Sequence, residues 1–576
     1  MSGAAGGLGR ILMMNALLAA ILALGVFLVV GIGGTENISR MIYFTVDFPG
    51  FVVVVLVSLL AMLPVLHGEA ARRVAGWSLA RIDVRWIAAL SLGLSVWCVH
   101  LVHDGYALSM DEWMTRLQGE IFLDGAVTAT LPEEWRAYGR GMFQGFANYD
   151  PASGSLASNY RPGMALLHAA FSMVGLGLYT SAILNAAAIL LVARVARQLF
   201  PDHAEVPVVA ALLLATSQQA FAASLTSYAM SAHLCFNLAW VTLFLDDRWQ
   251  RHVLAALVGV LTASLHQIHL HLFFALPFLL TLLRPFRPGL IALYGAIYLG
   301  GHLAVLGWDW LSFNRHLLAG SAQPIGGELP PASPAPGTAE RARAMLRGTG
   351  ADSTVTVAAN LVRLIAWQSL ALLPLLLLAL RLGSAFRYQR ALIASFALSL
   401  LPYLLLMPDQ GHGWGYRYLH GLLGSLALLA LPGWLVLRAA GGAVKLHAWI
   451  VVLLIGSPLL LLPFRGWQIA QFVGPYARAT AMVAAQDADV VIVNGFQVWI
   501  GGDIPRNSPV DPQRPIQMSD RRLTPAQIEA LCRDYRVAIP PPAAYAALGV
   551  RTSPEPVPTL REAFVARNAA LEGCRQ

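Results

Sequence analysis

Ser109-Met110-Asp111-Glu112-Trp113 is the stretch around which the rest of the sequence can be organised. It follows an apolar run from Trp86 to about Val102 and opens a polar loop that reaches Arg161. Two adjacent carboxylates at the rim of a membrane helix are costly unless they stay solvated or find partners. A loop that leaves a membrane often begins with charge, so the pair alone indicates only a solvated loop start or a helix cap.

The composition is that of a polytopic membrane protein. Of the 576 residues, 57% are hydrophobic and 12% are charged, and the mean hydropathy is +0.61. Repeated apolar runs of about 17–25 residues are long enough to span a bilayer. The formal net charge of +8 does not indicate a nucleic-acid partner. Most of the excess arginine lies in short loops between apolar runs, where it orients a membrane protein.

The apolar runs predict an all-α membrane domain of about 13 transmembrane helices. They lie at about 11–33, 50–66, 86–103, 178–199, 208–226, 229–245, 253–267, 270–283, 289–306, 357–380, 391–406, 419–437 and 448–463. When these runs are counted, every arginine-rich short loop falls on one side, which the positive-inside rule makes cytoplasmic. Asp111 and Glu112 then lie on the extracytoplasmic side.

The predicted membrane domain covers residues 1–464 and has two long external loops, 104–161 and 307–355. The first loop contains amphipathic pieces at 113–122 and 133–143, which are typical of helices on a membrane surface. The second is rich in Pro, Gly and Ala at its centre. An apolar segment at 162–175 is too short to cross comfortably.

Residues 465–576 have the pattern of a small α/β domain, which we place on the extracytoplasmic side. Short apolar runs predict strands at 489–493, 497–500 and 537–539. The sequence Thr524-Pro525-Ala526-Gln527 predicts a capped helix start, and residues 559–572 predict a terminal helix.

Cys532 and Cys574 are candidates for a disulfide within this domain. Each lies near the end of a predicted helix, and disulfides persist in an oxidising extracytoplasmic compartment. A bridge closing about 40 residues would stabilise the domain by roughly 4 kcal/mol in the chain-entropy model. Two unrelated thiols are the alternative.

Asp111 and Glu112 are the first candidates for chemistry. Neighbouring side chains on a helix diverge by roughly 100°, so we expect one to face a ligand and the other the scaffold or a cation. A carboxylate at the bilayer rim can deprotonate an incoming hydroxyl, and partial burial raises a carboxyl pKa toward the range that this step needs.

A second cluster is Gly411-His412-Gly413-Trp414-Gly415-Tyr416-Arg417-Tyr418-Leu419-His420, at the predicted outer end of a span. The planar guanidinium of Arg417 suits a phosphate, and the glycines permit close backbone approach. His412, Tyr416 and His420 are further candidates for contact with a substrate or a metal. An aromatic belt with a snorkelling arginine is the alternative, but the density of Gly, His and Arg favours a binding site.

A third cluster contains His266, His269 and His271. A spacing of three places His266 and His269 on one helical face, where they can bind a metal together with a carboxylate. Hydrogen bonds to a sugar or to neighbouring loops are the alternative, which we favour because no Cys-rich or His-Glu-x-x-His pattern is present. A divalent cation therefore stays open as a cofactor. The sequence has no Walker loop, dinucleotide fingerprint or Gly-x-Ser-x-Gly motif.

The Asp-Glu pair at the start of the first large external loop resembles the GT-C superfamily of integral-membrane glycosyltransferases. This superfamily includes protein O-mannosyltransferases and the aminoarabinose and arabinofuranosyl transferases of bacterial envelopes. The likeness continues through Tyr160-Arg161-Pro162-Gly163 and through Leu184-Asn185-Ala186 to Phe200, which is similar to the second core span of the superfamily. It covers roughly 80–465, with two extra spans in front, and residues 413–418 look like a late external motif of some bacterial members.

The resemblance implies transfer of a hexosyl or pentosyl unit from a polyprenyl-phosphate donor to a hydroxyl of an extracytoplasmic glycan, lipid or protein, with inversion. The setting would be the bacterial inner membrane. Asp111 would be the general base, and Glu112 would orient the loop or bind a cation. Arg417, with Arg161 second, would bind the phosphate, whose developing charge must be met by a cation. We expect one outward-facing cavity to be surrounded by Asp111, Arg161, His266, His269 and Arg417.

Two other functions compete with this interpretation. A lipid-linked polysaccharide polymerase or ligase would share the spans and the external arginine and histidine, but it needs no early Asp-Glu pair. A transporter would place ionisable residues near the middle of the membrane and would often show inverted repeats. The middles of the predicted spans are nearly free of charge, and no internal repeat at a fixed period is present.

Overall fold

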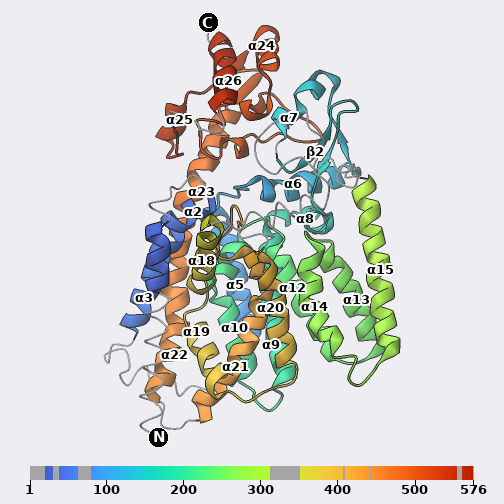
Figure 1. The fold of residues 1–576 in the computed structure, drawn as a ribbon, viewed down its shortest axis with the longest axis vertical. Helices are drawn as coiled ribbons and strands as arrows, with labels where there is room; N and C mark the ends of the chain where they lie inside the picture. Colours follow the sequence, from blue (N-terminus) through green and yellow to red (C-terminus); the bar gives the residue numbers. More distant parts are fainter. Residues whose placement is uncertain are drawn as a thin grey trace.

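The computed structural model describes residues 20–29, 38–61, 79–143, 145–311, 351–405, 409–439, 444–553 and 561–574. These residues form a bundle of long helices with a cap at one end, and two helices lie across the junction between them (Figure 1). They are α6 (Met110–Leu123) and α8 (Gly163–Ser172). Most of the predicted external loop 307–355 and the ends of the first predicted span lie outside the described residues.

The bundle consists of apolar helices, most of which overlap the predicted spans. Its helices are α2 (Ile38–Ile42), α3 (Phe48–Leu60), α5 (Val84–Leu101), α9 (Thr180–Leu199), α10 (Val206–Ala215), α11 (Gln218–Ser224), α12 (Met230–Leu245), α13 (Trp249–Ala263), α14 (Ile268–Leu280), α15 (Pro288–Leu311), α18 (Ala351–Ala366), α19 (Leu372–Leu382), α20 (Gln389–Leu405), α21 (Leu423–Ala439), α22 (Val444–Gly456) and α23 (Leu462–Ala484). The single predicted span 357–380 is instead two helices, α18 and α19, separated at 367–371, and α2 lies between the first two predicted spans. Six continuous described helices are long and apolar enough to cross a membrane, and α10 with α11, bent by 61°, can make a seventh crossing. The chain is therefore a multi-pass membrane protein, and the number thirteen stays a prediction.

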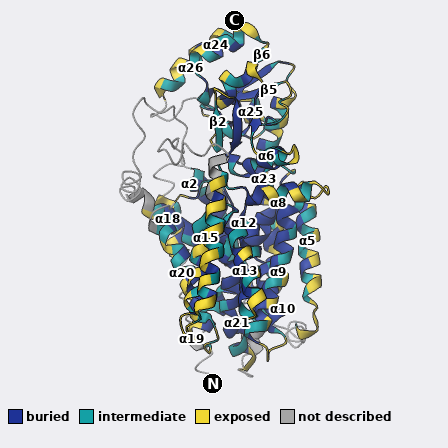
Figure 2. Cartoon of the chain, turned by 90° about the vertical axis from the view of Figure 1, so that its right-hand side faces the viewer, coloured by how far each residue is buried: buried dark blue, intermediate teal, exposed yellow. Residues whose placement is uncertain are grey.

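Small residues let the central helices approach one another closely. A Cβ added at Gly433 on α21 would lie 2.0 Å from the carbonyl oxygen of Leu375 on α19, so only glycine fits there. Close approach through small residues is typical of helix packing in membranes. The outermost helix, α15, is exposed along much of its length (Figure 2). Leu299 and Leu303 on this helix are 61% and 58% exposed, as a lipid-facing surface requires.

The cap is built from two distant segments of the chain. The first contributes α6, α7 (Gly139–Met142) and an antiparallel sheet in the order β1-β3-β2. Its strands are β1 (Ala129–Thr130), β2 (Ala147–Asp150) and β3 (Ser155–Ser158). The second contributes a parallel sheet in the order β5-β4-β6 and three helices. These elements are β4 (Val490–Val493), β5 (Ile516–Ser519), β6 (Val537–Ala538), α24 (Pro525–Asp534), α25 (Pro542–Ala547) and α26 (Arg561–Cys574).

The two segments share one apolar core. Leu117, Leu131 and Met142 from the first segment pack in the same cluster as Ile492 and Met518 from the second. In addition, α23 runs without a break across residue 465, where the sequence predicts the start of a separate domain. The external loop 104–161 and the C-terminal residues therefore fold as a joint layer over the bundle.

Several predictions for the C-terminal residues are confirmed. The strands at 489–493 and 537–539 correspond to β4 and β6. The predicted helix start has a complete capping box between Thr524 and Gln527. Cys532 and Cys574 form a disulfide with Cα atoms 5.3 Å apart, which links α24 to α26.

The predicted strand at 497–500 is wrong. Asn494 accepts a hydrogen bond from the backbone N–H of Gln497 through its side-chain oxygen, at 3.0 Å, which turns the chain back on itself. Ile500 then adopts a left-handed conformation with φ 54°, which a strand does not allow. The third strand is instead β5, which follows Pro515; its four residues Ile-Gln-Met-Ser do alternate apolar and polar side chains, but the run is short and is not among the predicted strands.

Candidate active site

The helix α6 presents the two carboxylates at its N-terminus. Ser109 caps the helix and accepts a hydrogen bond from the backbone N–H of Glu112, so Asp111 and Glu112 lie in the first turn. Negative charge is favourable there because the unpaired N–H groups and the helix dipole are positive at this end. The sequence therefore places both acids where a helix tolerates them best.

The two carboxylates point in different directions, as their adjacency predicts. Asp111 accepts a hydrogen bond from Nη1 of Arg417 at 2.6 Å, while its Oδ1 is buried without a partner among the described residues. Glu112 is 1% exposed and accepts from the backbone N–H of Ser227 at 3.4 Å. Burial raises the pKa of Glu112 to about 8, although Arg116 opposes this shift. Asp111 thus faces a polar partner at a cavity, and Glu112 faces the scaffold.

Arg417 begins the short helix η6 (Arg417–Leu422) and is held from several sides. Its guanidinium carbon lies 5.3 Å from the ring centre of Tyr228 and 5.4 Å from that of Tyr418. Gly413 has φ +127°, and a Cβ there would lie 2.9 Å from Cδ of Arg417. The glycine-rich loop therefore folds over the arginine, as the sequence suggests. Within the described chain, Nε of Arg417 is buried without a hydrogen-bond partner.

Two adjoining cavities meet at this ion pair. The cap-side cavity is lined mainly by α6, α8 and the end of the first cap segment. The bundle-side cavity is lined by α12, α14, α20 and η6. Tyr228, Ala229 and His266 line both. Asp111 lines the cap-side cavity and Arg417 lines the bundle-side cavity, so their hydrogen bond marks the boundary.

The wall of the cap-side cavity contains several polar side chains among apolar ones. Gln118 accepts from the backbone N–H of Ser158 at 2.9 Å, which ties α6 to β3. Tyr160 stacks on His266 with ring centres 4.6 Å apart, and Arg161 lies beside them. Burial lowers the pKa of His266 to about 4, so the imidazole is neutral at neutral pH. Such a wall offers hydrogen bonds and a flat aromatic surface to a sugar.

The structure separates the predicted site residues into groups. Asp111, Arg161, His266 and Arg417 surround the two cavities, and His269 lies outside both, bonded to Tyr403 at 2.9 Å. Three more candidates lie away from both cavities. They are His412, which lies 3.4 Å from Asp503, and Tyr416 and His420, which are both fully buried.

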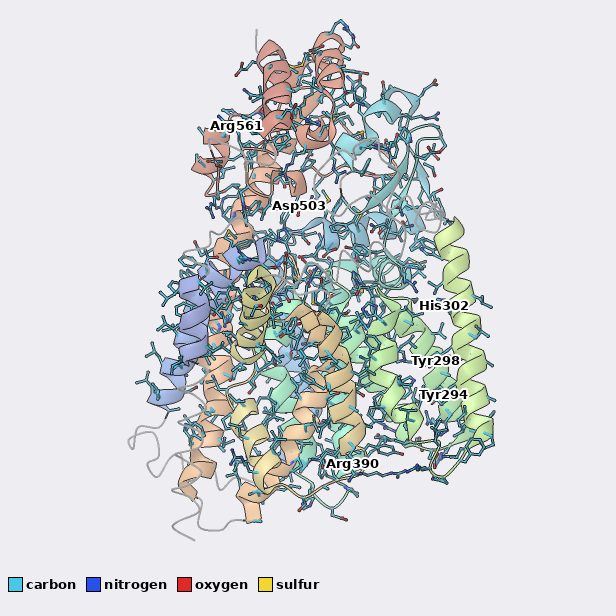
Figure 3. The ribbon with its side chains drawn as sticks, viewed as in Figure 1. Tyr294, Tyr298, His302, Arg390, Asp503 and Arg561 are labelled. Carbon is cyan, nitrogen blue, oxygen red and sulfur yellow. A yellow bond between two sulfur atoms is a disulfide. The ribbon has the colours of Figure 1, made fainter. Side chains whose placement is uncertain are left out.

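The expectation that His266 and His269 share a helical face is wrong, because α14 begins at Ile268 and His266 precedes it. His271 is bonded to Asn237 and to Tyr298, each at 2.9 Å. Tyr298 lies on α15, where Figure 3 labels it. The two ring nitrogens of His271 therefore hold α14 to α12 and α15. Across the described ranges, no group of three or more His, Cys, Asp and Glu residues is arranged to hold a metal ion.

Several site residues escaped the sequence analysis. Tyr228 borders both cavities, and its signal was the polar break Thr226-Ser227-Tyr228 between two predicted spans, on the same side as Asp111. Gln118 lay on a helix that was predicted correctly, but nothing indicated which face is buried. His233 lines the bundle-side cavity from inside an apolar run, where sequence alone does not separate it from a packed core histidine.

A segment of the C-terminal cap holds α6 in place from the other side. Arg506 donates to the carbonyl oxygen of Ala107 at 2.8 Å, and its guanidinium carbon lies 5.2 Å from the ring centre of Trp113. Ser508 is hydrogen-bonded to Glu120, near the other end of the helix. Asp503, labelled between cap and bundle in Figure 3, accepts from the backbone N–H of Met110 at 3.4 Å. The C-terminal residues therefore fix the helix that carries Asp111.

Comparisons with known proteins give a fold. No protein-family model and no curated protein matches the chain. The structure is similar to that of ArnT from Cupriavidus metallidurans in the apo state, with TM-score 0.50, 12% identity, and coverage of 80% of this chain and 94% of that one. At this identity the likeness shows a shared, mostly helical fold alone, and the number of spans and the separate C-terminal domain stay predictions.

Two further structures align less well. ArnT from Cupriavidus metallidurans bound to undecaprenyl phosphate has TM-score 0.47 and 11% identity, with 74% of this chain and 84% of that chain covered. The archaeal oligosaccharyltransferase AglB from Archaeoglobus fulgidus, in complex with an inhibitory peptide and a dolichol-phosphate, has TM-score 0.36 and 13% identity. Its alignment covers 74% of this chain and 64% of that chain.

Proposed function

We propose that this chain, which shares the fold of apo ArnT, is a GT-C-type glycosyltransferase. It would transfer a sugar from a polyprenyl-phosphate donor to a hydroxyl of an envelope glycan, lipid or protein, with inversion. One observation carries the proposal. A carboxylate with one oxygen that has no partner among the described residues and a buried arginine face each other at the boundary of two cavities.

The proposed step needs a base and a cation on opposite sides of the reacting carbon. Asp111 takes the proton of the acceptor hydroxyl while the oxygen forms a bond to the anomeric carbon. The bond from that carbon to the phosphate oxygen breaks, and its electron pair stays on the phosphate. Arg417 stabilises this developing charge because a buried, fixed donor costs little reorganisation during the reaction. Attack opposite the leaving group inverts the anomeric configuration.

The ion pair between Asp111 and Arg417 is the resting arrangement in this scheme. A guanidinium has five N–H donors, of which Nη1 contacts Asp111 and Nε has no described partner. A donor phosphate that binds Arg417 competes with Asp111 for the cation. Binding of the lipid donor thereby weakens the hydrogen bond between Arg417 and Asp111. Asp111 is then free to accept a proton when a substrate is present.

The two cavities suit the two halves of the donor. We assign the phosphate and the first isoprene units to the bundle-side cavity, whose wall includes Met230, Leu270 and Leu422. The sugar and the acceptor hydroxyl belong in the cap-side cavity with Asp111 and Arg161. Glu112 acts as a scaffold residue through its contact with Ser227 rather than as a cation ligand.

The orientation of the chain in the membrane is inferred from the positions of its arginine residues. Arg390 lies at the end of the bundle far from Asp503 and the cap (Figure 3), in one of the arginine-rich loops that the positive-inside rule makes cytoplasmic. We therefore place the cap on the extracytoplasmic side of a bacterial inner membrane. The disulfide between Cys532 and Cys574 supports this placement, since such bonds persist in oxidising compartments.

A release assay tests the proposal. The purified full chain in lipid nanodiscs would be incubated with undecaprenyl-phosphate-linked hexoses and pentoses and a crude envelope extract as acceptor. The expected result is free undecaprenyl phosphate together with a labelled acceptor, at a rate that Asp124→Asn leaves unchanged. Asp124 is exposed at the opposite end of α6, so it is a matched control for changes at Asp111. A chain that uses only diphosphate-linked oligosaccharides, with or without Asp111, would instead be the polymerase or ligase.

A further inference from the structure

Two polar side chains in the bundle-side cavity have no partner in the structure. His233 lies in the first turn of α12 and is 5% exposed, and neither of its ring nitrogens is hydrogen-bonded within the described residues. Ser399 on α20 is 2% exposed, and its hydroxyl is likewise unpaired in the described chain. Both line the cavity together with Arg417. Buried polar groups are nearly always paired, so these two indicate a ligand.

Neighbouring polar groups in the same helices are paired. Asn237, one turn after His233, is bonded to His271 and donates to the carbonyl oxygen of Gly421. Ser395, one turn before Ser399, donates to the carbonyl oxygen of Phe274 at 2.7 Å. Asn237 lines the bundle-side cavity and is paired, whereas His233 and Ser399 line the same cavity and have no hydrogen-bond partner among the described residues.

The charge of the cavity wall selects the kind of ligand. Among the described residues that line it there is one guanidinium and no carboxylate. His233 and Ser399 can both donate hydrogen bonds, the imidazole from one ring nitrogen and the serine from its hydroxyl. Arg417 contributes the open Nε. His233, Ser399 and Arg417 thus offer three hydrogen-bond donors, and Arg417 also supplies a positive charge. This combination suits an anion with several oxygens. The remaining wall of the cavity is largely apolar.

We propose that His233 and Ser399 bind the phosphate of the lipid donor together with Arg417. This inference rests on the proposed function and names residues that the resemblance to the superfamily does not supply. The phosphate oxygens accept one hydrogen bond each from His233 and Ser399, and no proton is transferred. The leaving group is thereby held on the bundle side of the reacting carbon, away from Asp111, which is the geometry that inversion requires.

The test is binding of undecaprenyl phosphate to the full chain in nanodiscs, with undecaprenol as the uncharged analogue and inorganic phosphate as a competitor. A hydrogen bond to a charged group corresponds to roughly ten- to a hundredfold in affinity. His233→Ala and Ser399→Ala should each weaken the binding of undecaprenyl phosphate by about that factor. Undecaprenol binding should be unchanged, and inorganic phosphate should compete only at high concentration, because the tail supplies most of the affinity.

His420→Ala is the matched control, because His420 is also buried and unpaired in the described chain but lines neither cavity. Equal weakening by His233→Ala and His420→Ala would overturn the assignment. So would unchanged affinity in His233→Ala while Arg417→Ala binds poorly. If His233→Ala does not fold, His233→Gln retains a donor and should keep most of the affinity. No binding of undecaprenyl phosphate to the unmodified protein would instead remove the proposed donor itself, a failure distinct from the other two.

Discussion

Two groups of buried charge in this molecule differ in how completely they are paired. In the first, which we call the anchor network, Arg363 is bonded to Asp47, Asn360 and the carbonyl oxygen of Ser39. Trp367 donates to the other oxygen of Asp47 at 2.7 Å. In the second, at the boundary of the cavities, Asp111 and Arg417 share one hydrogen bond, and each keeps a buried polar atom without a described partner.

Arg465 shows how tightly the anchor network is packed. It donates to Gln218 and Gln468, each at 2.8 Å, and to the carbonyl oxygen of Ala366 at 3.0 Å. A Cβ at Gly50 would lie 1.7 Å from its Nη1, so that position admits only glycine. The network joins α18 and α23 to the helix that contains Gly50. The polar groups of the anchor network that are named here all have hydrogen-bond partners, which indicates a structural role. The buried polar atoms of Asp111 and Arg417 that have no described partner indicate a binding site instead.

The largest expected effect is on catalysis. Asp111→Asn should reduce transfer by about 10²–10⁴-fold, because an amide cannot accept the acceptor's proton. The melting temperature should stay close to that of the unmodified protein, because Asn retains an acceptor for Arg417. Transfer and thermal unfolding would be measured on the same preparation, with Asp124→Asn alongside. Undiminished transfer by Asp111→Asn would move the base elsewhere.

The anchor network should respond in the opposite way. Asp47→Ala leaves Arg363 buried without its counter-ion, which costs about 3–5 kcal/mol of the free energy of unfolding. Transfer per folded molecule should be unchanged. Unfolding in detergent, with activity normalised to the folded fraction, separates the two quantities. A stable Asp47→Ala protein that has lost donor binding would give the network a role in function and erase the contrast between the two groups.

Substitutions of Arg417 test whether binding of the donor phosphate depends on the shape of the guanidinium or on its charge alone. Arg417→Ala should weaken undecaprenyl phosphate binding and turnover together, by roughly ten- to a hundredfold each. Arg417→Lys should recover only part of this loss, because an ammonium keeps the charge but lacks the planar fork. Binding and single-turnover measurements on both variants check this. Full recovery by lysine would mean that charge alone is needed.

A further prediction concerns pH and stability, and the expected total change across the pH window is similar to the effect of Asp47→Ala. The pKa of Glu112 is raised by burial to about 8, so between about pH 5 and pH 8 the folded state holds a proton that the unfolded state has lost. Stability should therefore fall with rising pH by about 1.4 kcal/mol per unit in this window and level off above it. Glu112→Gln should remove this part of the slope. An unchanged slope in that variant would assign the pH dependence to other groups.

Local signals explain which parts of this structure the sequence predicts. The apolar runs and the cap at Thr524 depend on neighbouring residues, and each corresponds to an element found in the fold. The disulfide was also within reach, because only Cys532 and Cys574 lie in the C-terminal segment. Short polar strands such as β3, with the sequence Ser-Leu-Ala-Ser, carry no comparable signal.

Contacts between distant residues explain what the sequence does not predict. Asp111 and Arg417 are 306 positions apart, and their spacing carries no information about the hydrogen bond between them. Both residues are candidates in the sequence because of their side-chain chemistry. Only the folded structure determines that they are in contact. Whether the ring nitrogens of His233 find hydrogen-bond partners depends on how α12, α20 and η6 pack around the bundle-side cavity, which is a property of the assembled bundle.

The two-segment construction of the cap has a consequence for how the protein is made. Asn507 donates to the carbonyl oxygen of Met142 across 365 positions, and Arg506 reaches Ala107 across 399. A ribosome that has already delivered α6 has not yet delivered Arg506 and Asn507, which hold the segment around it. In a nascent chain, the bundle helices through α23 are therefore made before the cap around α6 can be completed.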